Sequence, residues 1–99
     1  MALLLSGASA PTTGTRAVTN IFKKTTVSAT VKGTGAVSAT VVIEGSNRGV
    51  NWVTLGTITL SGTTSATDGF GFDFSWPYTR ARLTAISGTG ATVTSDVEG

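Results

Sequence analysis

The residues in this chain that could do chemistry are few, and their spacing does not suit catalysis. The sequence contains no His and no Cys, so it lacks the commonest general base, the thiolate nucleophile and the usual ligands of transition metals. No serine has a histidine or an S-x-x-K lysine to activate it. The five acidic residues are scattered near turns and the chain end: Glu44, Asp68, Asp73, Asp96 and Glu98. We therefore expect no enzymatic activity, no catalytic residue and no cofactor.

Calcium is the one metal that this composition leaves as an alternative, because a hard cation needs only oxygen ligands. Asp68, Asp73 and Asp96 are the candidate ligands, together with backbone carbonyl groups. They are not spaced as in a calcium-binding loop. The sequence therefore predicts no metal site.

The residues best suited to contact a partner are basic and aromatic. Arg48 stands in the bend GSNRGVNW, where Ser, Asn and Gly suffice to reverse the chain and the arginine is not required. In W-P-Y-x-R-x-R, Tyr78, Arg80 and Arg82 share one face of a strand. These four residues are the candidate partner-binding surface. They would suit a nucleic-acid backbone or an acidic protein surface, but the net charge of +2 is small, so nucleic acid is not the expected partner.

The elements that must position these residues are strands, because apolar residues alternate with period two from Thr25 onward. Two Gly-Thr-Gly segments, at 33–35 and 88–90, predict hairpin loops. A change of phase around Gly56 predicts a bulge or a strand that switches sheets. The inward-facing residues expected from the alternation are Val27, Ala29, Val31, Val37, Ala39, Val41, Ile43, Phe70, Phe72, Phe74, Trp76, Ala81, Leu83, Ala85, Val93 and Val97.

This pattern predicts an all-β fold: a single small antiparallel β-sandwich, jelly-roll-like, formed by residues 25–99. Residues 1–24 are expected to form an extended N-terminal arm and the first edge segment. Its Leu3, Leu4 and Leu5 are too few for a signal peptide or a membrane span, and we expect them to bind a neighbouring subunit. Only 12% of the residues are charged, which also favours a surface that meets other protein chains, in a homo-oligomer and not at a membrane.

The segment VVIEGSNRGVNWVTLGTITL resembles the strand, G-S-N-x-G-x-x-W, strand hairpin of discoidin-like β-sandwiches and of small virion proteins of tailed bacteriophages. The Thr- and Gly-rich body, the aromatic strand and the closing S-G-T-G segment are more similar to the phage group. Arg48 stands where an acidic residue is expected, so no metal or sugar role is carried over to it. The resemblance implies a head decoration (cement) protein that binds the major capsid protein and is located in the virion, which is assembled in the host cytoplasm.

Two other functions stay open at the level of sequence. One is a carbohydrate-binding module that uses the loop 46–52 and Tyr78, with Trp52 and Trp76 as further aromatic candidates. The other is a tail or head-fibre component of the virion. No residue pattern in the chain excludes either of them.

Overall fold

The computed structural model describes residues 2–19, 24–72 and 76–98. The described residues contain no helix, so the all-β expectation is confirmed. Six strands form one antiparallel sheet that does not close on itself. Their bounds are β1 Ala2–Ala8, β2 Thr12–Thr13, β3 Ala17–Val18, β4 Thr25–Ser46, β5 Val53–Phe72 and β6 Tyr78–Glu98.

The order of the strands in the sheet is β1-β6-β4-β5, and β2 and β3 also pair with β6. The three short strands therefore follow the whole length of β6, from Val97 opposite Ala2 to Tyr78 opposite Val18. In effect, the N-terminal segment is a fourth long strand that is broken into three pieces. The sheet begins at this broken strand and ends at β5.

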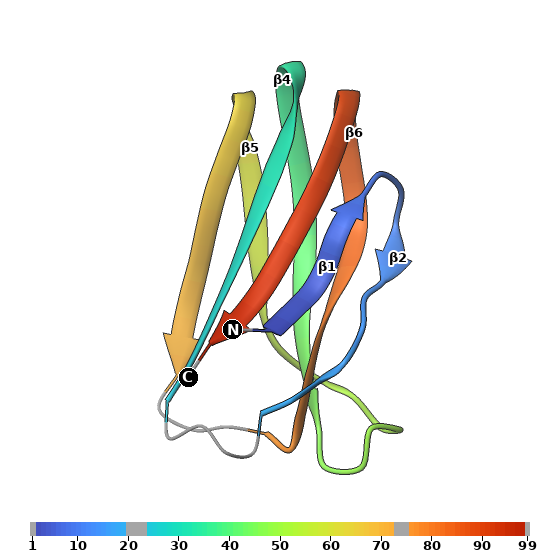
Figure 1. Ribbon diagram of the computed structural model, residues 1–99, viewed down its shortest axis with the longest axis vertical. Helices are drawn as coiled ribbons and strands as arrows, with labels where there is room; N and C mark the ends of the chain where they lie inside the picture. The colour runs from blue at the N-terminus through green and yellow to red at the C-terminus, as the bar shows by residue number, and fades with distance from the viewer. Residues whose placement is uncertain (1, 20–23, 73–75, 99) are drawn as a thin grey trace.

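Each long strand changes direction near its middle, so that the sheet folds over on itself (Figure 1). The corners carry the sequences Gly-Thr-Gly at 33–35, Gly-Thr-Thr at 62–64 and Gly-Thr-Gly at 88–90. The third corner residue has a positive φ in every case: 78° at Gly35, 68° at Thr64 and 66° at Gly90. Glycine adopts this conformation without strain, which suits it to the third position of the two Gly-Thr-Gly corners.

The prediction that the two Gly-Thr-Gly segments form hairpin loops is wrong. Residues 25–32 and 36–46 both belong to β4, and each part pairs with β5 and β6. The two Gly-Thr-Gly corners instead lie beside each other, with Thr34 opposite Thr89. Glycine allows the chain to turn there, but the turn bends a strand and does not join two neighbouring strands.

The core lies between the two halves of the folded sheet. A Cβ atom on Gly56, in the first half of β5, would lie 2.5 Å from Cζ of Phe70, in the second half. Phe70 and Phe72 are half-buried, so the predicted aromatic wall is only partly enclosed; Phe74 lies outside the described residues. The buried apolar residues include most of those expected from the alternation: Val27, Ala29, Val31, Val37, Ala39, Val41, Ile43, Ala81, Leu83, Val93 and Val97.

Two bulges change which face of the sheet the following side chains lie on. Ile43 is opposite Gly56 and Glu44 is opposite Thr54, so Leu55 is the extra residue. This confirms the bulge predicted around Gly56. A second shift, in β6, inserts one residue before Ala85 and leaves Ala85 exposed, contrary to the expected inward face.

The expected N-terminal arm is part of the domain. Leu4 and Leu5 have only 1% and 4% of their surface exposed and belong to the same core as the long strands, whereas Leu3 is 50% exposed. The N–H group of Thr15 donates to the carbonyl oxygen of Leu4 at 2.9 Å, which fixes the returning segment against β1. The expectation that these leucines bind a neighbouring subunit is therefore wrong for Leu4 and Leu5, because their own chain already buries them.

Candidate interaction site

Loops that are far apart in the sequence gather at one end of the folded sheet (Figure 1). Residues 47–52 connect β4 to β5 there, and Ser46 at the end of β4 is opposite Tyr78 at the start of β6. The N-terminal segment reaches the same end, where the N–H group of Thr19 donates to the carbonyl oxygen of Pro77 at 2.9 Å. Residues 46–52, the start of β6 with Pro77, and the N-terminal segment up to Thr19 therefore form one surface, which we call the loop end.

The bend at 46–49 has the turn chemistry that its composition predicts. The hydroxyl oxygen of Ser46 accepts hydrogen bonds from the N–H groups of Arg48, at 3.3 Å, and Gly49, at 2.8 Å. Ser46 is fully buried, and Gly49 has a φ of 78°, which glycine adopts without strain. The turn is thus fixed by Ser46 and Gly49, and the Arg48 side chain is free to serve another purpose.

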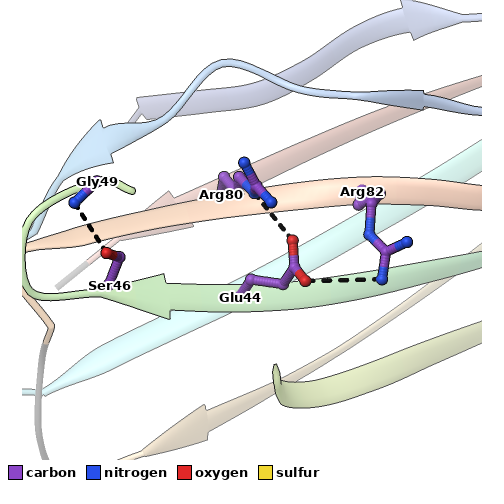
Figure 2. A network of polar contacts seen from close by, with 5 residues as sticks. All are labelled: Glu44, Ser46, Gly49, Arg80 and Arg82. Carbon is purple, nitrogen blue, oxygen red and sulfur yellow. Dashed lines mark hydrogen bonds and ion pairs between the residues drawn. The ribbon is translucent and has the colours of Figure 1, made fainter. Parts of the chain in front are cut away.

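A buried carboxylate organises the neighbouring arginines. Glu44 has 8% of its side chain exposed; its Oε1 lies 2.9 Å from Nε of Arg80, and its Oε2 lies 3.6 Å from Nη2 of Arg82 (Figure 2). Glu44 and Arg80 are direct cross-strand partners on β4 and β6. Opposite charges in this position stabilise the sheet pairing and the buried carboxylate. Sequence reasoning missed this role of Glu44, because it depends on the register between the two strands.

Two arginine–aromatic stacks complete the loop end. The guanidinium carbon of Arg80 lies 4.0 Å from the centre of the Trp52 ring, and that of Arg16 lies 4.7 Å from the centre of the Tyr78 ring. Such stacks orient the guanidinium groups and hold them on the surface. Arg16 was not among the predicted site residues. Nothing in its local sequence distinguishes it, since the returning N-terminal segment brings it to Tyr78.

The structure therefore brings all four predicted surface residues, Arg48, Tyr78, Arg80 and Arg82, to one end of the molecule. Tyr78 is half-buried and lies under Arg16, so it is less accessible than expected. The predicted leucines are not part of this site.

A shallow pocket of about 340 Å³ opens beside the bend; its lining residues are Ser46, Asn47, Arg48, Asn51, Val53 and Trp76. Arg48 is exposed and forms no ion pair with any described residue. The indole N–H of Trp76 is buried and has no hydrogen-bond partner within the described part of the chain. The pocket thus offers a cation, two amide side chains and an aromatic ring.

The described residues include no group of three or more side chains that could hold a metal ion. The described part of the chain also contains no helix that is long and apolar enough to cross a bilayer. In comparisons with known proteins, no family model and no curated protein matches this chain.

Proposed function

We propose that this protein is a non-enzymatic structural protein of a tailed-phage virion, a decoration protein whose loop end binds an acidic surface of the major capsid protein. The observation that carries the proposal is the gathering of Arg16, Arg48, Arg80 and Arg82, all the arginines of the chain, at the loop end. Among the described residues, Glu44 forms the ion pairs that offset part of this charge. Such a surface fits an acidic protein partner.

The rest of the molecule supports a role in assembly. The body has few charges and many exposed threonines, which favours surfaces that pack against other protein chains. The folded sheet acts as a rigid frame, and we infer that it is used as a jelly-roll-like β-sandwich module on the outside of the head. The same chemistry would serve a tail or head-fibre position, which localisation on the particle distinguishes.

The test is co-sedimentation of the purified chain with heads of the tailed phage whose genome encodes it. We expect Arg48→Glu to weaken binding at least about tenfold, because juxtaposed like charges cost more than about 1.4 kcal/mol. Lys32→Glu is the matched control, since Lys32 is exposed beside a sheet corner, away from the loop end. Binding to heads should also weaken as salt concentration rises.

Equal binding by both variants, or no binding by the unaltered chain, would contradict the proposal. Binding that nuclease treatment abolishes would contradict it as well, because the partner would then be nucleic acid. Immunogold labelling of whole particles places the protein on the head or on the tail.

The pocket beside the bend favours a second candidate, carbohydrate binding. Asn47 and Asn51 carry amide groups that bind sugar hydroxyls, and the Trp76 side chain, which also lines the pocket, supplies an aromatic surface. A glycan array tests this candidate directly. Binding that is lost in an Asn47→Ala variant and is independent of phage heads would support it, whereas an array without binding would reject it.

A further inference from the structure

The two edges of the sheet differ sharply in how they are protected. At one edge the N-terminal segment is broken into three short strands, contains Pro11, and pairs with β6 through irregular registers. At the other edge β5 runs unbroken from Val53 to Phe72. In the described part of the chain β5 pairs with β4 alone, and it forms the outer margin of the sheet in Figure 1. Proteins normally keep such long edges from pairing with other chains.

Charged and proline residues, two usual protective devices, are nearly absent from β5, and its one bulge lies near its start, at Leu55. Residues 53–72 contain no Lys, no Arg and no Pro, and their one acidic residue is Asp68. The carboxylate of Asp68 already accepts a hydrogen bond from the N–H group of Gly69, at 2.8 Å. Because β4 is the one described strand that pairs with β5, the outward backbone groups of residues 57–61 meet no other described strand and are open to a second chain.

Apolar side chains next to this edge are incompletely covered. Val53 is 49% exposed, and Leu55, Ala66 and Phe70 are only half-buried although they pack against the core. The inner strand β4 differs, since its inward-facing valines are all buried. A strand added beside β5 would bury part of this surface and pair the open backbone groups.

The two halves of β5 are not equally suited to pairing. Residues 57–61, Thr-Ile-Thr-Leu-Ser, are uncharged, lie past the Leu55 bulge and are rich in residues that favour strands. In the second half, an antiparallel pair centred near Asp68 would bring two carboxylates together, and Gly69 and Gly71 weaken the strand. The first half is therefore the better pairing segment.

We propose that two copies of this chain pair through residues 57–61 of β5, antiparallel and about a twofold axis at Thr59. The segment is self-complementary in this arrangement, because Thr59 faces Thr59 and Ile58 faces Leu60 of the second copy. A second copy is the occupant that this sequence fits, since an isologous contact uses the same patch twice and closes after two chains. The inference does not rest on binding to a capsid.

The test uses a cysteine, because the chain has none of its own. In an antiparallel pair, residues directly opposite each other have Cα atoms about 4.5 to 5.5 Å apart, which suits a disulfide. We expect Thr59→Cys to form a disulfide-linked dimer in nearly full yield on mild oxidation. Thr94→Cys, also exposed but on the inner strand β6, should pair in the same way and form no disulfide-linked dimer.

Sedimentation of the full chain without phage heads provides the second measurement. The unaltered chain and Thr94→Lys should dimerise, whereas Thr59→Lys should be monomeric with an unchanged circular dichroism spectrum, because two ammonium groups would meet at the axis. A monomeric unaltered chain at every concentration, a dimeric Thr59→Lys chain, or equal cross-linking at residues 59 and 94 would overturn the proposal. Arg48→Glu should still dimerise, which separates this contact from binding to heads.

Discussion

At the scale of single residues, the corners of the sheet depend on one backbone conformation. Gly35 and Gly90 adopt the positive φ of the corner without strain, but Thr64 adopts it with a β-branched side chain. Thr64 is the one non-glycine residue with a positive φ among those described. Because the left-handed conformation costs an L-residue about 1 to 2 kcal/mol, this corner carries strain that the other two lack.

We therefore expect Thr64→Gly to stabilise the protein by up to about 1 kcal/mol. The substitution relieves the strain of the positive φ, but part of this gain is lost because glycine makes the unfolded chain more flexible. Thr63→Gly is the matched control, since Thr63 is the exposed neighbour without a positive φ. It should lower the free energy of unfolding by about 0.5 to 1 kcal/mol. Urea denaturation of the two variants measures both effects, and a destabilised Thr64→Gly protein would show that the corner is not strained.

At the scale of elements, β1 decides whether the N-terminal segment belongs to the domain. Adjacent leucines have opposite environments there: Leu4 is buried in the core, and Leu3 is half exposed. Gly14 lies so close that an added Cβ atom would be 1.8 Å from the carbonyl oxygen of Leu4. The returning segment therefore packs directly on β1, and the strand is held from two sides.

Leu4→Ala is expected to lower the free energy of unfolding by about 2 to 5 kcal/mol, because it leaves a cavity in the core. Leu3→Ala should change it by no more than about 0.5 kcal/mol, as is usual for exposed positions. Chemical denaturation of the isolated chain distinguishes the two outcomes. Equal, small effects would restore the hypothesis of a free arm that needs a neighbouring subunit.

At the scale of the whole molecule, the first strand pairs with the last. Ala2 lies opposite Val97, so β1 cannot complete its pairing until β6 has been made. The long strands also pair residues that are distant in the sequence, such as Thr26 with Glu98. Non-local pairing of this kind imposes a large loop-closure cost before contacts stabilise the fold.

Refolding is therefore expected in milliseconds to seconds, as for other all-β domains, and not in microseconds. Stopped-flow tryptophan fluorescence after dilution from urea measures the rate. Leu4→Ala should mainly speed unfolding if β1 docks last, whereas Leu3→Ala should alter neither rate. A strongly slowed refolding rate in Leu4→Ala would instead place β1 in the folding nucleus.

Sequence reasoning succeeded where burial follows local alternation. Val27, Val41 and Val93 were placed on the inner face because side chains of a strand alternate between faces, and this period is visible in the sequence. It failed at Ala85, because a bulge in β6 moves that residue to the outer face. The bulge arises from the pairing with β4, which the sequence of β6 does not contain.

The sequence by itself determined that the chain is all-β, which apolar residues of β4 and most of those of β6 face the core, and that the chain contains no His and no Cys. Only the tertiary structure decided which segments the Gly-Thr-Gly corners connect, that Leu4 and Leu5 are buried by their own chain, and that Glu44 forms ion pairs with Arg80 and Arg82. The reason is physical: periodicity fixes which face of a strand is buried, but the strand register and the fold of the sheet come from contacts between segments far apart in the chain.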